Sequence, residues 1–286
     1  MPLRDQSKYE IVVPDEPKEV TEIRKHILDA FGDLEFVDEG HKYFLHGREL
    51  TPVSTIVSRF ESEFDTVAKA TAYAEKNGNT PEYWMDQWKF TNLKATVTGT
   101  QVHSYAESLA WIHMMHPENI TEDNKYKYIK DKNWLIPTRP KEESALKFWQ
   151  NFPQDMWVVL PETKLYSGIN PDKPKFKEDF GGTMDLLMYY KNPNDDSKSG
   201  LVLGDWKTNG NLYKEFSRAT KKMMFPPFQE YFEENLSAYT IQLSCYQIPL
   251  EDRGYKVLGR RIIWLKDDCY EVISVNNETK KLREIL

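Results

Sequence analysis

Short apolar stretches of strand length follow one another in the middle and at the end of the chain. Three successive stretches cover residues 156–166, 183–190 and 201–207, and two more cover residues 260–265 and 270–275. A polar stretch rich in Pro, Asn, Asp and Gly separates the second from the third and is typical of a turn. The pattern therefore predicts a β-meander, with two further strands near the C-terminus.

Helical periodicity surrounds these strands. It is clearest at residues 98–113, where Val102, Tyr105, Leu109 and Ile112 form one apolar stripe. A meander followed by a helix and a further strand predicts an α/β fold, in which helices flank a mixed β-sheet. Further helices are expected at residues 21–31, 54–76 and 142–152, and from residue 229 or 237 to residue 248, with Pro249 ending the last one.

The first third of the chain is expected to support the rest. Residues 36–50 predict a hairpin that turns at His46-Gly47. The sequence shows no internal repeat and no long linker, so residues 1–95 are expected to form an accessory region packed on a core of residues 96–286. An aromatic segment in this region is expected to be buried core, although such rings can also stack on unpaired bases; it comprises Tyr83, Trp84, Trp88 and Phe90.

Composition limits the class of protein. With 40% hydrophobic and 13% aromatic residues the chain is expected to be globular. It has no apolar run of the roughly 20 residues needed to cross a membrane, and its start resembles neither a secretory signal nor a mitochondrial presequence. We therefore expect a cytoplasmic protein that does not interact with membranes.

The net charge of −7 argues against a protein that coats nucleic acid, since phosphate contacts need Lys and Arg. The negative net charge is compatible with an enzyme that has a local basic groove. A first lysine cluster is interpreted as solvated surface, namely Lys125, Lys127, Lys130 and Lys132. A second cluster is interpreted as phosphate-contacting, namely Lys207, Lys214, Arg218, Lys221 and Lys222.

The two cysteines exclude one kind of cofactor. Cys245 and Cys269 both lie in apolar surroundings and are expected to be reduced core residues. Two thiols cannot supply the four ligands of an iron–sulfur cluster. The chain also lacks a P-loop motif, so any helicase motor would have to be another chain.

Two acidic residues and a lysine are expected to meet across the predicted hairpin. Asp185 begins one strand and Asp205 ends the next, so a turn near residue 195 places them face to face. Alternation puts Asp205 and Lys207 on the same face of their strand, with Trp206 on the other. Two carboxylates beside an ammonium can hold a divalent cation next to a phosphate.

Other acid-x-Lys strings occur in the chain, and three of the four lie in polar loops or in the C-terminal tail. The fourth, Glu162-Thr163-Lys164, follows an apolar strand and is a serious rival. It has no acid on a preceding strand, so Glu162 is interpreted as a neighbouring acid and not as the centre of the site.

Two helical pairs complete the set of candidate residues. His103 and Glu107 are four residues apart and share a face directed away from the apolar stripe. Gln242 and Tyr246 have the same spacing on a later helix. A lone helical histidine is usually structural, but this one occurs together with the two acids and the lysine downstream.

Over residues 95–250 these motifs resemble the RecB-type branch of the PD-(D/E)XK nuclease superfamily. Within that branch the chain is similar to exonucleases related to the mitochondrial genome maintenance exonuclease and to their phage homologues. One departure is that Met184, and not proline, precedes Asp185. The shared pattern G-T-x-x-H-x-x-x-E, G-x-x-D, D-W-K-T and Q-x-x-x-Y corresponds to Gly99, Thr100, His103 and Glu107; Gly182 and Asp185; Asp205, Trp206, Lys207 and Thr208; and Gln242 and Tyr246.

The resemblance implies a restriction-endonuclease-like αβββαβ core and a set of roles. Mg²⁺ or Mn²⁺ would be bound by Asp185, Asp205, the carbonyl of Trp206 and His103. Lys207 would activate the attacking water, and Glu107 would complete the catalytic group. The nucleic acid would be contacted, or the site braced, by Thr208, Glu162, Gln242, Tyr246, Lys221 and Lys222.

The implied function is a metal-dependent DNA exonuclease that acts on single strands or DNA ends in a bacterial or phage-infected cytoplasm. A helicase, a single-strand-binding protein or a recombination protein would be its partner. The motifs do not separate this function from that of a structure-specific or nicking endonuclease. A nucleic-acid-binding module without catalysis is the alternative from another class.

Overall fold

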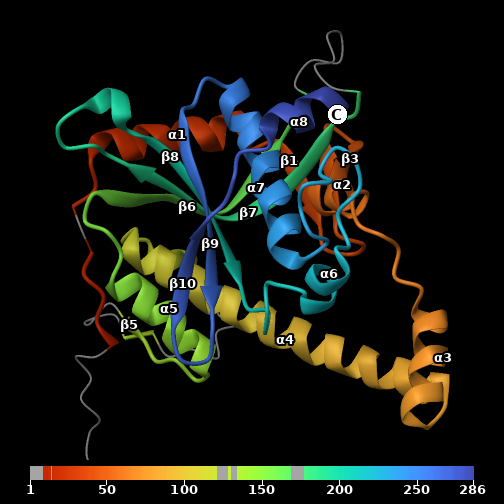
Figure 1. The fold of residues 1–286 in the computed structure, drawn as a ribbon. Coiled ribbons are helices and arrows are strands. Elements are labelled where there is room, and N and C mark those ends of the chain that lie inside the picture. The colour runs from red at the N-terminus through yellow and green to blue at the C-terminus, as the bar shows by residue number, and fades with distance from the viewer. Residues whose placement is uncertain (1–8, 14, 121–127, 130–133, 169–176) are drawn as a thin grey trace, which may run out of the picture.

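The computed structural model of the protein describes residues 9–13, 15–120, 128–129, 134–168 and 177–286 (Figure 1). It is an α/β protein with a mixed, open β-sheet of eight strands flanked by helices. The order of strands in the sheet is β1 (Leu34–Val37), β2 (Lys42–Leu45), β3 (Arg48–Pro52), β7 (Phe180–Tyr190), β8 (Gly200–Lys207), β9 (Val257–Leu265) and β10 (Tyr270–Ser274), and β6 (Met156–Tyr166) pairs with β7.

The predicted meander forms the centre of this sheet. Strands β6 (Met156–Tyr166), β7 (Phe180–Tyr190) and β8 (Gly200–Lys207) are antiparallel neighbours. Helix α7 (Asn235–Asp252) then crosses over to β9 (Val257–Leu265), which is parallel to β8. The prediction of a meander followed by a crossover helix is confirmed, and β10 (Tyr270–Ser274) adds an antiparallel edge strand.

The N-terminal strands belong to the same sheet. The expected hairpin is a three-stranded unit of β1 (Leu34–Val37), β2 (Lys42–Leu45) and β3 (Arg48–Pro52), because a second turn closes it before residue 42. Strand β3 runs parallel to the first residues of β7 and pairs with them. In addition, a two-stranded sheet consists of β4 (Tyr128–Ile129) and β5 (Trp134–Leu135).

Strands β3 and β8 share one edge of β7. Gly181 pairs with β3 on one side and with β6 on the other, while the residues from Leu186 onward pair with β8 and β6. Between these two pairings, residues 182–185 pair with no described strand on the β3–β8 edge. The sheet therefore splits at this point, and Asp185 lies at the split.

Helices cover both faces of the sheet, and each layer has its own core. Helices α4 (Pro81–His113) and α5 (Pro140–Gln150) pack on one face, where Trp149 and Trp206 are fully buried. Helix α7 packs on the other face. It is joined there by α1 (Lys18–Phe31), α2 (Val53–Ser58) and α8 (Thr279–Ile285).

Three predicted helix boundaries are wrong for local reasons. Residues 54–76 form two helices, α2 and α3 (Thr66–Asn77), because the Asp65 side chain accepts the N–H of Ala68 and starts a new helix. Helix α7 continues through Pro249 to Asp252, so this proline does not end it. The expected helix at 98–113 is the second half of α4, which has 33 residues and begins at Pro81 behind an N-cap at Thr80.

The aromatic segment at the start of α4 is not core, contrary to the prediction. Tyr83 and Phe90 are exposed, and Trp84 packs against Tyr73 of α3 with ring centres 4.7 Å apart. Figure 1 shows the reason, since α3 and the first half of α4 project away from the sheet as an arm. The predicted boundary at residue 95 lies within this continuous helix, and the division into accessory region and core stays a prediction.

Other expectations have mixed outcomes. Cys245 is buried as predicted, whereas Cys269 is exposed because it lies in the turn between β9 and β10. Lys125, Lys127, Lys130 and Lys132 lie outside the described residues. In the part of the chain that the structure describes, no helix is both long and apolar enough to cross a membrane.

Candidate functional site

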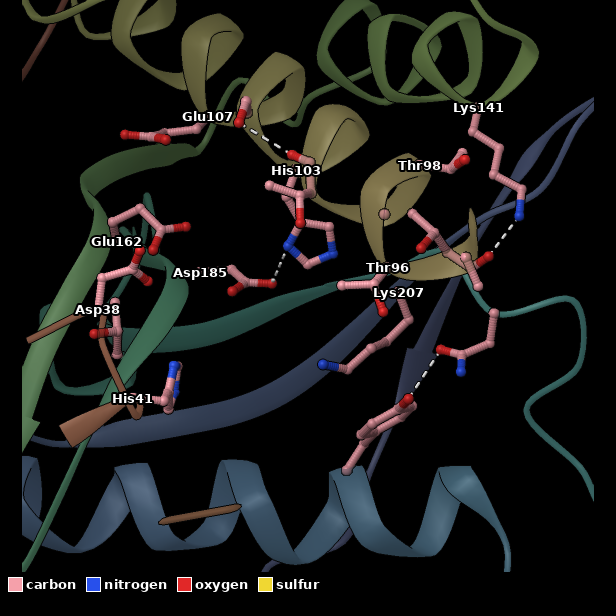
Figure 2. Close-up of a pocket in the computed structure, with 18 of the residues that line it drawn as sticks. Asp38, His41, Thr96, Thr98, His103, Glu107, Lys141, Glu162, Asp185 and Lys207 are labelled. Carbon is pink, nitrogen blue, oxygen red and sulfur yellow. Dashed lines mark hydrogen bonds and ion pairs between the residues drawn. The ribbon is translucent and has the colours of Figure 1, made fainter. Parts of the chain in front are cut away.

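A cavity of about 1220 Å³ opens where β7 and β8 separate. Four of the elements that line it carry candidate residues from the sequence. Helix α4 supplies His103 and Glu107, β6 supplies Glu162, β7 supplies Asp185 and β8 supplies Lys207 (Figure 2). The structure thus places these five residues, which the sequence singled out separately, around one cavity.

Asp185 and Trp206 join the two strands beyond the end of their ladder. The last backbone pair is Leu186 with Gly204. Beyond this pair, the N–H of Trp206, two residues after Gly204, donates to Oδ2 of Asp185, one residue before Leu186, over 2.7 Å. The Trp206 ring is buried on the opposite face against Phe148, so Asp205 and Lys207 on either side of it are turned toward the site.

Lys207 is held between an acid and an aromatic ring. Its ammonium nitrogen lies 2.5 Å from Oδ2 of Asp205 and 4.1 Å from the ring centre of Tyr239. Burial alone would lower the pKa of Lys207, but the charges of Asp205 and Asp185 outweigh burial and raise it. Lys207 is therefore a fixed cation in the site.

His103 faces Asp185 from the α4 side. Its Nδ1 lies 3.5 Å from Oδ2 of Asp185. Burial, aided by the nearby charge of Lys207, lowers the pKa of His103 to about 4. The imidazole is thus neutral near pH 7, which is the form that binds metal ions.

The carboxylates outnumber the cations around Lys207. Asp205 is 1% exposed, and burial, together with the charge of Asp185, raises its pKa to about 6. Burial also raises the pKa of Asp185 and of Glu107. Oδ2 of Asp205 is buried, and the only cation beside it is the Lys207 ammonium, among the groups that the structure describes. Such a site favours an added cation.

Glu162 lies closer to the centre of the site than the sequence suggested. Its neighbours Pro161 and Thr163 pair with Leu186 and Met184, so Glu162 lies opposite Asp185. Its φ of 44° is left-handed, which is uncommon for a residue other than glycine inside a strand. Enclosure by the cavity and the charge of Asp185 raise its pKa, an effect that is moderated because the side chain is exposed to solvent.

Two glycines of the motifs allow close approaches. A Cβ on Gly99 would lie 3.2 Å from Oγ1 of Thr208, so Gly99 lets the Thr208 hydroxyl approach α4. A Cβ on Gly182 would lie 2.8 Å from the ring of Tyr246. Tyr246 is buried and packs under Gly182, and Gln242 donates to its hydroxyl over 3.5 Å. Neither Gln242 nor Tyr246 lines the cavity, and their placement is that of a brace.

The basic residues after β8 are not gathered at the site. Lys222 forms an ion pair of 2.6 Å with Glu233, and Lys221 is exposed at the end of α6 (Glu215–Thr220). Neither residue lines the cavity. A role in steering nucleic acid stays a prediction for both.

Several residues of the site are not among those that the sequence singled out. Tyr239 precedes Gln242 by three positions on α7, a spacing that could have indicated a shared face. Lys141 of α5 donates to the carbonyl of Thr208 and holds the loop after β8. The cavity is also lined by Lys94 and, from the N-terminal strands, by Phe36, Asp38, His41 and Tyr43, which the sequence did not single out as site residues.

The donor set is rich in oxygen and includes one neutral imidazole, which suits Mg²⁺ or Mn²⁺. Among the described residues, no three His, Cys, Asp or Glu side chains are yet gathered closely enough to hold a metal ion. The nearest obstacle is Lys207, which occupies the Oδ2 side of Asp205. Compared with known proteins, the sequence matches no family model and no curated protein.

Proposed function

We propose that the protein is a metal-dependent nuclease that hydrolyses phosphodiester bonds in DNA. The observation that carries the proposal is the convergence of Asp185, Lys207 and His103 at one open cavity, with Asp205 buried against Lys207 behind the cavity wall. Two acids and a fixed cation of this kind can bind a divalent cation and a phosphate side by side.

The topology supports the same proposal. A helix, three antiparallel strands, a crossover helix and a parallel strand occur in the order α4, β6, β7, β8, α7 and β9, with β4, β5 and α5 inserted between α4 and β6 and with α6 inserted between β8 and α7. This order agrees with the restriction-endonuclease-like αβββαβ core that the sequence motifs imply. We therefore assign the chain, as a proposal, to the RecB-type branch of the PD-(D/E)XK nucleases.

The acids and the imidazole are suited to hold Mg²⁺ or Mn²⁺. The ligands would be Asp185, Asp205, His103 and the carbonyl of Trp206, and the buried carboxylates, whose pKa values burial raises, support this fit because an added cation would offset their charge. When bound, such a cation polarises a phosphate and lowers the pKa of a bound water. No iron–sulfur cluster is invoked.

The protein's own groups then have distinct roles. Lys207 donates hydrogen bonds to a phosphate oxygen or orients the attacking water, and Asp205 and Tyr239 fix its position. Glu107 and Glu162 line the same cavity and add acceptors for water or a cation. Thr208 and Lys141 hold the loop that forms one rim.

We further propose that the enzyme is an exonuclease acting on single strands or ends, and that it works in the cytoplasm with a helicase, a single-strand-binding protein or a recombination protein. This part rests on the sequence resemblance, since the site geometry serves exonucleases and endonucleases alike. A structure-specific or nicking endonuclease is the alternative with the same residues.

The test uses 5′- and 3′-labelled single-stranded and double-stranded DNA and a closed circle, each with Mg²⁺, Mn²⁺ or EDTA. We expect stepwise shortening that requires metal and is lost in Asp205→Ala and Lys207→Ala. The matched control is Asp196→Asn, an exposed acid in the β7–β8 loop. Cutting of the circle would identify an endonuclease. DNA binding without cleavage in any metal would identify a binding module and refute the proposed activity.

A further inference from the structure

Three aromatic rings form a cluster at the tip of the β1–β2 hairpin. The ring centre of Phe36 lies 5.0 Å from that of Tyr43, its cross-strand partner, and 5.0 Å from that of His41. His41 and Tyr43 are also in contact, with centres 5.6 Å apart. We refer to Phe36, His41 and Tyr43 as the aromatic platform.

The platform extends the buried face of the hairpin beyond the core. Leu34 pairs with Leu45 on the same face, and both are buried. Two residues further along β1, Phe36 is 38% exposed and lines the cavity. Its inward-facing ring therefore borders the cavity and not the protein interior.

The turn and one hydrogen bond fix the platform in place. Gly40 and His41 both have left-handed φ angles, of 80° and 52°, which close the tight turn after Asp38. Tyr43 is buried, and its hydroxyl is hydrogen-bonded to Oγ1 of Thr183 over 3.3 Å. The platform is thereby tied to β7 two residues before Asp185.

The platform and the helices α4 and α5 lie on different sides of one space. Figure 2 shows Asp38 and His41 across the cavity from His103 of α4 and Lys141 of α5. Lys94, Lys141, Lys164 and Lys207 also line this space, so phosphates can be held around it. Its volume of about 1220 Å³ exceeds the roughly 300–1,000 Å³ of ordinary small-molecule sites, which suits a segment of a polymer.

We propose that the aromatic platform stacks on a nucleobase of the bound strand, next to the phosphate that is cleaved. This inference rests on the proposed nuclease function and adds a binding subsite to it. Every base presents a π-face, so stacking on Phe36 holds a nucleotide in register without selecting its sequence. His41 and Tyr43 limit the rotation of the Phe36 ring, which reduces the conformational entropy lost on binding.

A purely structural role is the competing explanation, since cross-strand aromatic pairs stabilise hairpins. The two roles differ in what replaces Phe36. Phe36→Leu keeps an apolar contact with Tyr43 but has no ring to stack, whereas Phe36→Trp keeps a ring. If Phe36 stacks on a base, Phe36→Leu loses affinity for the oligonucleotide and Phe36→Trp retains it. If its role is structural, the affinity of each variant changes in parallel with its melting temperature.

The experiment measures binding of a short oligonucleotide that carries the fluorescent base 2-aminopurine at its end. Ca²⁺ replaces Mg²⁺ and Mn²⁺, and gels run on the same samples verify that the oligonucleotide is intact. With wild type we expect quenching of the fluorescence, which reports stacking. With Phe36→Ala and Phe36→Leu we expect loss of quenching and roughly 5- to 100-fold weaker binding, as for other stacked bases. Phe216→Ala, at an exposed phenylalanine outside the cavity, is the control.

The outcomes separate the two proposals. The platform proposal is overturned, and the nuclease proposal stays intact, under three conditions. The wild type cleaves DNA, it does not quench the fluorescence of the end base, and Phe36→Leu binds the oligonucleotide as tightly as the wild type does. Wild type that binds no oligonucleotide overturns both. Weaker binding that only accompanies a lower melting temperature, with no rescue in Phe36→Trp, also overturns the platform.

Discussion

The ammonium group of Lys207 lies over the ring of Tyr239, 4.1 Å from its centre. The Tyr239 hydroxyl in turn donates to Oδ1 of Asn209 over 2.9 Å, so one side chain connects the proposed catalytic lysine to the loop that follows it. This contact and the ion pair with Asp205 together fix the position of the lysine.

Replacement of Tyr239 tests this contact. We expect Tyr239→Leu to lower kcat roughly 2- to 30-fold, because a cation–π contact contributes about 0.5–2 kcal/mol. Tyr239→Phe keeps the ring and is expected to retain most of the activity. Steady-state kinetics on a labelled oligonucleotide measures both variants. An equal decrease of kcat in Tyr239→Leu and Tyr239→Phe would show that the hydrogen bond to Asn209, and not the ring, supports activity.

Divalent cations are expected to stabilise the folded protein. A ligand that binds only the native state adds about 2.7 kcal/mol at a hundred times its Kd, which corresponds to several degrees in Tm. Thermal melts with EDTA, Mg²⁺ and Mn²⁺ measure the shift. It should disappear in Asp185→Asn and persist in Asp196→Asn. A shift of equal size in Asp185→Asn would place the cation elsewhere.

Gly182→Ala is expected to destabilise the protein. The added methyl would lie 2.8 Å from the buried Tyr246 ring, and such overpacking costs about 1–3 kcal/mol. Chemical denaturation measures the free energy of unfolding. The control is Gly210→Ala, where a Cβ meets nothing within 4 Å and the expected change is within about 0.5 kcal/mol.

A double variant shows whether the clash itself is responsible. In the double variant Gly182→Ala with Tyr246→Leu the ring is absent. We therefore expect the double variant to lose less unfolding free energy than the two single variants lose together. Strict additivity would mean that Gly182 is required for another reason.

His113 is expected to make stability depend on pH outside the proposed site. It is buried at the end of α4 against Trp149 and Phe152, and burial lowers its pKa from 6.5 to about 4, although the charge of Glu16 opposes this shift. The unfolded chain therefore binds a proton at higher pH than the folded chain. The contribution of His113 to the free energy of unfolding is therefore complete above about pH 6.5. It decreases by about 3 kcal/mol as the pH falls to about 4.

Urea unfolding between pH 7 and pH 4 measures this loss. His113→Gln is expected to flatten the dependence over that window, and His26→Gln, at an exposed histidine, is the matched control. A dependence that is as steep in His113→Gln as in wild type would assign the loss to other groups.

The sequence by itself determined those features that depend on local periodicity. Alternation along β8 fixed which side of the strand carries Asp205 and Lys207, because the backbone of any strand sends successive side chains to opposite faces. Helical spacing fixed in the same way that His103 and Glu107 point away from the apolar stripe of α4. The turn-forming residues between the strands fixed the hairpin that brings Asp185 beside Asp205.

The tertiary structure alone decided where these faces meet and what else borders them. The pairing of β3 with β7 splits the sheet at Asp185, and it joins segments far apart in the chain that no local pattern relates. The left-handed backbone at Glu162 and the packing of Tyr239 on Lys207 likewise depend on neighbours from other elements. Periodicity sets the direction of a side chain relative to its own element, whereas the contents of a cavity depend on contacts between elements, which only the folded chain fixes.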